Sequence, residues 1–317
     1  MNEYKNPLVL QRADPWCLLH TDGWYYFTGS VPKYNCIELR RSRTLNGLAD
    51  AEGVVIWKKH KDGEMSYNVW APELHYVNGK WYIYFAAGRA DNHFMHRCYC
   101  LECSDENPVD GTWTEKGQID TGWEDFALDM TSFEHKGSQY FIWAQRDEST
   151  GGNSNLYIAR CKNPWTIETE PLMITRPEYD WEKIGFEVNE GAAVLKHGGK
   201  IFVSYSASKT DFNYCMGLLW IDENDDLLDA SNWHKSDKPV FETCEENHQY
   251  GPGHNSFTKD GGKDILIYHC RSYKDIEGDS LYDPNRHARA LAFDYDENGF
   301  PVFGKPPKDN ISHNLHD

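Results

Sequence analysis

HTDGWYYFTG, residues 20–29, is the first of five similar stretches that decide the fold. The other four are HYVNGKWYIYFAA (75–87), FEHKGSQYFIWAQ (133–145), LKHGGKIFVSYSA (195–207) and FTKDGGKDILIYHC (257–270). Each contains polar residues, a glycine and then a short apolar and aromatic run, which indicates a β-hairpin whose glycine takes the positive φ of a tight turn. The glycines are Gly23, Gly79, Gly137, Gly199 and Gly262, with spacings of 56, 58, 62 and 63 residues.

Each hairpin is followed by a segment typical of a third strand: NCIELRRS, RCYCLECS, SNLYIARC, CMGLLWID and ARALAFDY. A fourth strand is marked by tryptophan in VVIWKK, TWTEKG, PWTIET and NWHKSD. Five units of four strands predict an all-β, five-bladed β-propeller, with a β-sandwich as the alternative. Because no Pro-, Ser- or Gly-rich linker divides the chain, we expect a single domain over residues 1–317. The ring would close if NPLVLQ paired with the last blade near PVFG.

Composition limits the function classes. The 317 residues carry a formal net charge of −18, which argues against nucleic acid and anionic membrane surfaces and favours a neutral partner. No apolar stretch approaches 18 residues, so no transmembrane helix is expected. The N-terminus shows no signal peptide and the nine cysteines show no paired framework, which together favour a cytoplasmic location.

The repeat also predicts which polar side chains meet on the propeller axis. Counting back eight or nine residues from each turn glycine reaches Asp14, Trp70, Asp129, Glu190 and His254. Since the first strand of each blade lines the central channel, these residues should converge in one funnel at the axis. Buried carboxylates that converge usually mark a site, although a ring of solvated turn acids is the alternative. Three carboxylates beside an aromatic wall suit glycosidic bond cleavage, which needs an acid and a base.

Short motifs around these positions resemble glycoside hydrolase family 43. They are ADPW (13–16), WAPE (70–73), ALDMTSF (127–133), NEGAAV (189–194), GPGHNSF (251–257) and ARALAFDYDENGFPVFG (288–304). The resemblance implies that Asp14 is the general base, that Asp129 orients the acid and tunes its pKa, and that Glu190 is the general acid. ALDMTSF and NEGAAV depart from commoner forms of these motifs, so the pocket shape is expected to differ while the carboxylates remain.

The resemblance also implies three binding residues. Trp70 would stack beside the sugar, Arg289 would hydrogen-bond to it, and His254 would lie near a hydrated structural cation, commonly calcium. The alternatives are blade-core packing for Trp70, a surface strand arginine for Arg289, and a hydrogen bond to water or a carboxylate for His254. No organic cofactor is expected.

Three cysteines have C-x-C-x-x-C spacing: Cys98, Cys100 and Cys103. Packing within a strand explains them better than zinc binding, because no second cysteine pair at zinc-finger spacing follows.

The expected function is an inverting hydrolase that releases terminal α-L-arabinofuranose from arabino-oligosaccharides or arabinan side chains. The chain stops soon after the fifth blade, whereas many xylosidases of the family carry a further β-sandwich, and this favours the arabinofuranosidase. A β-D-xylosidase, a bifunctional enzyme, a non-catalytic carbohydrate-binding propeller and a scaffold for protein partners are the alternatives. The expected partner is a neutral oligosaccharide or polysaccharide, and the sequence leaves the oligomeric state open.

Overall fold

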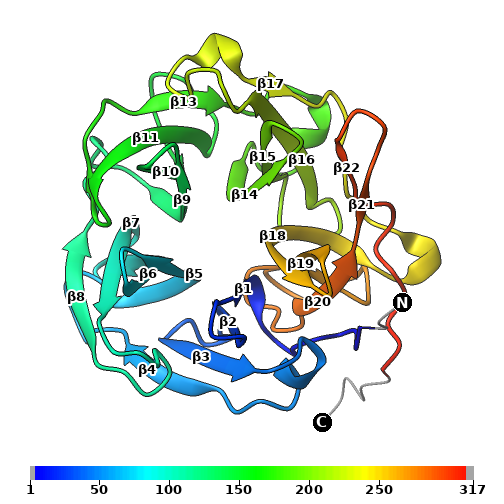
Figure 1. Cartoon of the computed structure of the whole chain (residues 1–317), viewed down its shortest axis with the longest axis horizontal. Helices are drawn as coiled ribbons and strands as arrows, with labels where there is room; N and C mark the ends of the chain where they lie inside the picture. Colours follow the sequence, from blue (N-terminus) through cyan, green and yellow to red (C-terminus); the bar gives the residue numbers. More distant parts are fainter. Residues whose placement is uncertain (1–3, 312–317) are drawn as a thin grey trace.

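Five antiparallel sheets surround a central axis as blades, so the fold is the five-bladed β-propeller that the repeat predicts (Figure 1). The computed structural model describes residues 4–311, and the expected domain limits at residues 1 and 317 lie outside that range. Each blade begins with a strand beside the axis. These inner strands are β1 (Ala13–Leu19), β5 (Tyr67–Val77), β9 (Ala127–His135), β14 (Asn189–His197) and β18 (Tyr250–Asp260).

The remaining strands follow outward from the axis in chain order. The second strands are β2 (Tyr25–Ser30), β6 (Lys80–Arg89), β10 (Ser138–Gln145), β15 (Lys200–Ala207) and β19 (Lys263–Arg271). The third strands are β3 (Cys36–Ser42), β7 (Asn92–Cys103), β11 (Asn155–Asn163), β16 (Cys215–Asp222) and β20 (His287–Ala292). We number the blades 1 to 5 in this order. The outer strands are β4 (Val54–Lys58) in blade 1, β8 (Trp113–Gln118) in blade 2, β12 (Thr166–Ile167) and β13 (Leu172–Thr175) in blade 3, and β17 (His234–Lys235) in blade 4. Among the described residues blade 5 has three strands rather than the four that the repeat predicts.

The inner hairpins form where the five glycines predict them. All five turn glycines have φ between +76° and +81°, the region that a residue with a Cβ adopts only with strain. The return strands pair antiparallel with the inner strands, as in the register Val77 to Lys80 of blade 2.

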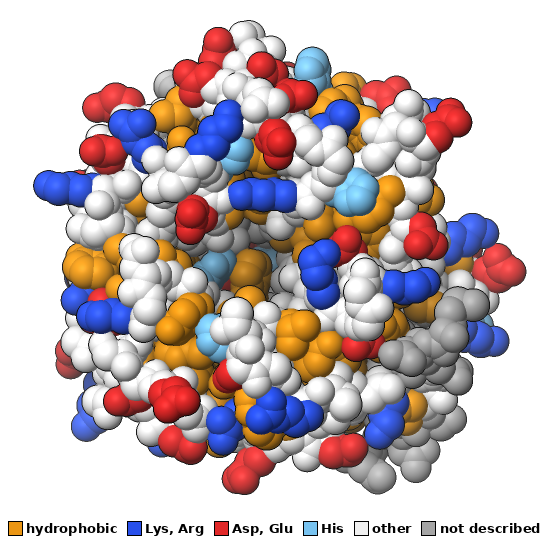
Figure 2. All heavy atoms as spheres, in the orientation of Figure 1, with side chains coloured by type: hydrophobic (Ala, Val, Ile, Leu, Met, Phe, Trp, Pro, Cys, Tyr) orange, Lys and Arg blue, Asp and Glu red, His pale blue; other side chains and the backbone are white. Residues whose placement is uncertain are grey.

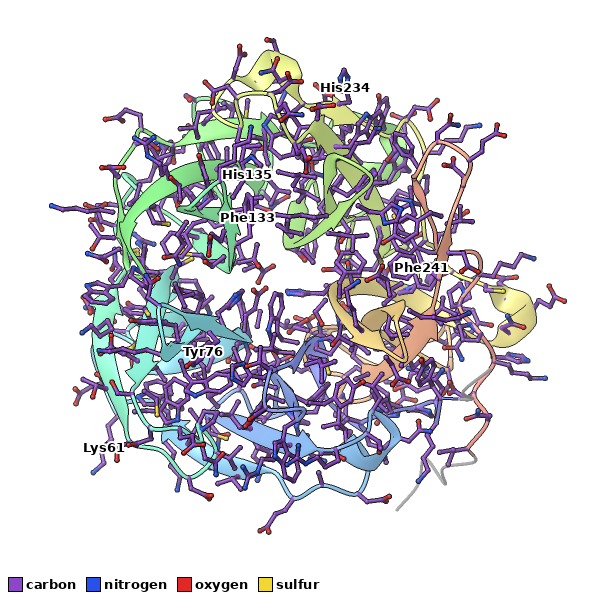
Figure 3. All side chains as sticks on the ribbon, viewed as in Figure 1. Lys61, Tyr76, Phe133, His135, His234 and Phe241 are labelled. Carbon is purple, nitrogen blue, oxygen red and sulfur yellow. The ribbon has the colours of Figure 1, made fainter. Side chains whose placement is uncertain are left out.

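Apolar side chains fill the wedges between neighbouring blades. Each of the five buried clusters joins two blades in sequence around the ring, including one between blade 5 and blade 1. Phe133 lies in the wedge between blades 3 and 4, and Phe241 lies between blades 4 and 5 (Figure 3). The core is therefore distributed around the axis, which leaves the inner strands free to present polar side chains there.

The N-terminal segment closes the ring on blade 5. The amide of Leu8 donates to the carbonyl of Ala288 (2.7 Å), and the amide of Ala288 donates to the carbonyl of Val9 (2.9 Å). This contact with β20 places the segment on the last blade, as expected, but at Ala288 rather than near PVFG. PVFG instead contributes to a separate hairpin of β21 (Asp294–Tyr295) and β22 (Pro301–Val302).

Helical structure is limited to single turns in the part of the chain described. There are four 3₁₀ turns: η1 (Asn46–Leu48), η2 (Asp180–Glu182), η3 (Ala230–Asn232) and η4 (Glu245–Asn247). None of the helices within residues 4–311 has the length and apolar character needed to cross a membrane.

Candidate active site

The axis holds a cavity to which every blade contributes. It has a volume of about 560 Å³. The face of the molecule that Figure 2 shows is hollowed near its centre. Charged side chains of both signs are spread over that face rather than gathered in one patch. Five of the six predicted residues line the cavity: Asp14, Trp70, Asp129, Glu190 and His254.

A backbone bulge in each inner strand points these side chains toward the axis. One residue per inner strand near the cavity has φ between +42° and +59°; these residues are Asp14, Ala71, Asp129, Gly191 and His254. Each lies where the register between the inner and second strands shifts. A left-handed residue with a Cβ costs about 1–2 kcal/mol, and such strain clusters at functional sites.

The bulges correct the predicted equivalence of the five positions. The left-handed residue is Ala71 in blade 2 and Gly191 in blade 4, whereas it is the predicted residue itself in the other three blades. Trp70 and Glu190 therefore lie one residue before the position that corresponds to Asp14. All five predicted side chains still line the cavity.

Asp14 is held as an ionised carboxylate. Ser30 donates a hydrogen bond to its Oδ2 (2.5 Å), and the guanidinium of Arg286 lies 3.4 Å from Oδ1. Burial alone would raise the pKa of Asp14, but the charge of Arg286 and the Ser30 hydrogen bond, among other contacts, hold this pKa below its usual range. Asp14 is therefore suited to accept a proton.

Glu190 and Asp129 have the opposite environment. Burial raises the pKa of Glu190 to about 7, although a hydrogen bond from the Tyr214 hydroxyl to its Oε1 (2.9 Å) opposes the rise. Burial, with the charges of Glu190 and Asp14, raises the pKa of Asp129 well above its usual range. The amide of Gly191 donates to Asp129 Oδ2 (3.0 Å). The Asp129–Glu190 pair therefore keeps a proton at neutral pH, whereas Asp14 is ionised.

His254 and Trp70 complete the part of the wall that the sequence predicts. His254 Nδ1 lies 3.3 Å from Asp14 Oδ1 and 3.8 Å from Asp129 Oδ2. Trp70 lines the cavity and also stacks on His96, with ring centroids 3.9 Å apart and planes at 10°. Trp70 thus combines the two environments that were considered for it, cavity wall and packed aromatic.

Arg289 does not reach the cavity, which corrects its predicted position. Its guanidinium is fully buried in blade 5, where it forms two 2.8 Å hydrogen bonds to Asp309 and further bonds to the carbonyls of Cys270 and His287. The side chain is committed to holding the C-terminal segment onto β20. It is therefore neither a ligand of the cavity nor a surface arginine.

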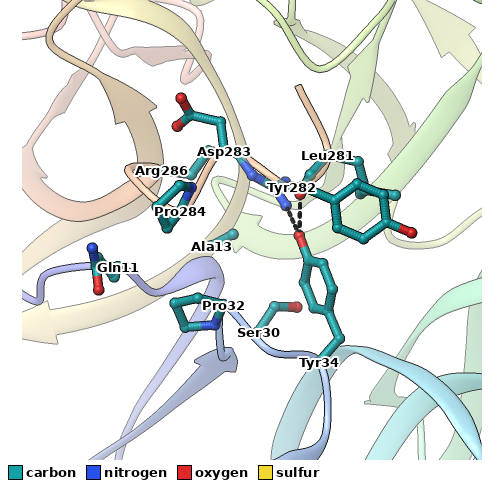
Figure 4. A pocket seen from close by; sticks show the side chains of 10 residues that line it. All are labelled: Gln11, Ala13, Ser30, Pro32, Tyr34, Leu281, Tyr282, Asp283, Pro284 and Arg286. Carbon is teal, nitrogen blue, oxygen red and sulfur yellow. Dashed lines mark hydrogen bonds between the residues drawn. The ribbon is translucent and has the colours of Figure 1, made fainter. Parts of the chain in front are cut away.

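Arg286 is the arginine of the cavity, and the sequence reasoning missed it. It lines the cavity, faces Asp14, and donates from Nη2 to the hydroxyl of Tyr34 (2.7 Å). That hydroxyl in turn donates to the carbonyl of Leu281 (2.5 Å; Figure 4). The guanidinium of Arg286 is therefore held by Asp14 on one side and by the Tyr34 hydroxyl on the other. Arg286 immediately precedes β20, and its position at a strand end was the signal that could have separated it from Arg289 in mid-strand.

The residues present do not offer a direct ligand set for a cation. Within the described range, no three His, Cys, Asp or Glu side chains are grouped as they would be around a metal. His254 turns its Nδ1 toward two carboxylates that already have other partners. The hydrated cation expected near His254 stays a prediction.

The fold and the site together define a class of protein. One ionised carboxylate and one protonated carboxyl group in a shared cavity are the equipment of a glycoside hydrolase. The family model described as "Glycosyl hydrolases family 43" matches residues 4–301. The chain belongs to this family.

Named relatives are similar over most of the chain. An extracellular exo-α-(1→5)-L-arabinofuranosidase of Streptomyces avermitilis is 51% identical over 311 residues, which cover 98% of this chain and 65% of the relative. The chain thus spans just under two thirds of that relative's length. An enzyme of the same name from Streptomyces chartreusis is 51% identical over 87% of this chain and 85% of its own. The crystal structure of an α-L-arabinofuranosidase from Lactobacillus brevis has a TM-score of 0.95, with 54% identity over 98% of both chains.

The expected cytoplasmic location is contradicted by these relatives. Both Streptomyces enzymes are named as extracellular. The cysteines misled the inference because free thiols do not require a reducing compartment when they are buried. All nine are free and seven are buried, where cysteine packs as a small hydrophobe. Cys98, Cys100 and Cys103 are among them and pack in the wedges on either side of blade 2.

Proposed function

We propose that this chain is an exo-acting, inverting α-L-arabinofuranosidase that releases terminal arabinofuranose from α-1,5-linked arabino-oligosaccharides or arabinan side chains. The observation that carries the chemistry is the contrast between Asp14 and Glu190 within one cavity. The choice of sugar is supported by the names of relatives about half identical to this chain. A neutral sugar also suits a chain with a net charge of −18.

In the proposed reaction, Asp14 takes a proton from a water molecule, whose oxygen attacks the anomeric carbon of the terminal sugar. The bond from that carbon to the leaving-group oxygen breaks, and Glu190 supplies the proton that this oxygen needs. Attack from the face opposite the leaving group inverts the anomeric configuration.

Three neighbours support the pair in this scheme. Asp129 lies beside the acid, and repulsion between the two carboxylates favours a proton on the pair. Arg286 stabilises the ionised base. Trp70 offers an aromatic wall, on which a sugar ring packs through its apolar face.

The first test compares p-nitrophenyl α-L-arabinofuranoside with p-nitrophenyl β-D-xylopyranoside, and follows the anomer released from arabinobiose by ¹H NMR. We expect clear preference for the arabinoside and inversion at the anomeric carbon. Preference for the xyloside would overturn the substrate and keep the mechanism. Retention would overturn the roles of Asp14 and Glu190, and hydrolysis of neither glycoside nor arabinotriose would overturn the enzyme proposal.

The role of Glu190 predicts a loss that depends on the leaving group. In Glu190→Gln, hydrolysis of arabinotriose should fall about 10²–10⁴-fold, because a sugar alkoxide needs a proton in order to leave. The p-nitrophenyl glycoside should lose much less, since p-nitrophenolate is stable without a proton. Glu134→Gln is the control, because Glu134 is an exposed carboxylate on inner strand β9. Equal losses on both substrates would contradict the assignment of the acid.

A further inference from the structure

Tyr214 contacts the proposed acid from the wall of the cavity. It is buried immediately before β16, lines the cavity, and donates its hydroxyl hydrogen to Oε1 of Glu190 at 2.9 Å. Because one carboxyl oxygen is held in this way, Oε2 is left as the oxygen able to face a glycosidic bond. The hydroxyl also favours the carboxylate that remains after Glu190 gives up its proton.

The ring of Tyr214 stacks on a residue that holds the proposed base. The rings of Tyr214 and His269 are nearly parallel, with centroids 5.7 Å apart and planes at 4°. His269 Nδ1 accepts the backbone amide of Asp14 at 2.9 Å. Since this nitrogen is an acceptor, His269 is neutral, in agreement with a pKa that burial lowers well below its usual range. Asp14 is also the residue whose left-handed backbone needs such support.

The motif GPGHNSF forms the slot for the Tyr214 ring. A Cβ at Gly253 would lie 2.5 Å from Cε1 of Tyr214, closer than any real contact. A Cβ at Gly251 would lie 2.1 Å from the carbonyl oxygen of Asp211, and Gly251 has φ of +62°. The two glycines are therefore explained by close approach to Tyr214 and to the turn that carries it.

We propose that Tyr214 and His269 are positioning residues, a stacked pair that sets the separation and orientation of the acid Glu190 and the base Asp14. The proposal rests on the acid and base roles assigned above. In an inverting enzyme the two carboxyl groups must leave room for one water molecule, so their separation decides whether attack is productive. Tyr214 hydrogen-bonds to the side chain of the acid, and His269 hydrogen-bonds to the backbone amide of the base. The stack thus links the two reacting groups.

The first experiment is Tyr214→Phe, which keeps the stacked ring and removes only the hydroxyl. We expect kcat on arabinotriose to fall about 10-fold, as for loss of one hydrogen bond to a charged group, with KM changed less than about 2-fold. The basic limb of the pH profile should move to higher pH, because the carboxylate of Glu190 loses a donor and its pKa rises. Tyr268→Phe is the matched control, since Tyr268 is a fully buried tyrosine of blade 5 whose hydroxyl has no partner among the described residues.

The second experiment is His269→Asn, whose side-chain oxygen can still accept the amide of Asp14 while the stacked ring is lost. We expect a fall in kcat with a small change in KM. In the double variant Tyr214→Phe/His269→Asn the two effects should be clearly non-additive, because the residues act through one stack. Additive effects on kcat in the double variant would overturn the proposal. A lower Tm of Tyr214→Phe with an unmoved pH profile would show that the pair is merely structural and would overturn it as well.

Titration of the Glu190 carboxyl carbon by ¹³C NMR in the free protein separates this proposal from the proposed function. Tyr214→Phe should raise the pKa of Glu190 in that titration whatever sugar the enzyme hydrolyses. A chain inactive on every arabinoside with this shift present would overturn the function alone. An active chain without the shift would overturn the role of Tyr214 alone.

Discussion

At the scale of single residues, the contrast between two carboxyl groups determines the expected pH dependence. Glu190 must be protonated, so kcat/KM should fall as pH rises through its pKa of about 7. Asp14 must be ionised, and its pKa lies below the usual range of aspartate, so activity should fall on the acid side only at pH values below about 4. A pH profile of kcat/KM on arabinotriose checks both limbs. A basic limb near pH 4–5 would show that Glu190 is not the acid.

Two arginines three residues apart should give opposite results when they are replaced. Arg289→Met should lower the free energy of unfolding by about 3 kcal/mol, because two carbonyls and Asp309 lose their partner, and should leave the kcat/KM of the folded fraction unchanged. Arg286→Met should lower kcat/KM at least about 10²-fold and move the acid limb to higher pH, because Asp14 loses its cation. Urea unfolding and pH profiles of both variants measure this. A normal profile in Arg286→Met would remove Arg286 from the site.

The three carboxylates and Arg289 show which side chains could be placed from the sequence and which could not. Asp14, Asp129 and Glu190 could be placed in the cavity because the repeat assigns them to inner strands, and inner strands meet at the axis. Arg289 could not be placed because the repeat does not tell which way a third-strand residue points or which buried partner it has. Its partner, Asp309, lies beyond the last repeat, and no spacing rule connects them.

At the scale of elements, the bulges of the inner strands point side chains toward the propeller axis. Gly191 has φ of +59°, and a Cβ there would lie 3.0 Å from Cγ of His254. Gly191→Ala should therefore cost about 1–2 kcal/mol of stability and, by displacing His254 and the amide bonded to Asp129, should also lower kcat. In the control Gly79→Ala, φ is +81° and no atom lies within 4 Å of the new Cβ, so stability should fall while kcat per folded molecule is kept. Equal kcat in both variants would contradict a role for the blade 4 bulge.

Bulges also explain where counting along the repeat fails. The hairpin glycines could be predicted because a tight turn demands their φ. The extra residue of a bulge leaves no comparable mark, since Asp14, Ala71 and His254 take a left-handed backbone without being glycine. The count was therefore right about which side chains line the cavity and wrong by one residue about which positions correspond in blades 2 and 4.

At the scale of the whole molecule, the ring couples every blade to the site. The five apolar clusters lie between blades rather than within them, and each cavity-lining carboxylate comes from a different blade. The distance between acid and base therefore depends on blade packing, and a ring that opens at one wedge would separate the groups that must act together.

The wedge where the chain closes on itself is the place to test that dependence. Leu8 is fully buried in the cluster between blades 5 and 1, while Leu10, two residues later in the same segment, is 40% exposed. Leu8→Ala should lower the free energy of unfolding by about 2–5 kcal/mol, whereas Leu10→Ala should change it by less than about 0.5 kcal/mol. In Leu8→Ala, loss of activity and loss of tryptophan fluorescence should share one urea midpoint, because opening the ring removes both the core and the site. Equal stability of the two variants, or activity that is lost well before fluorescence changes, would show that this segment does not hold the ring closed.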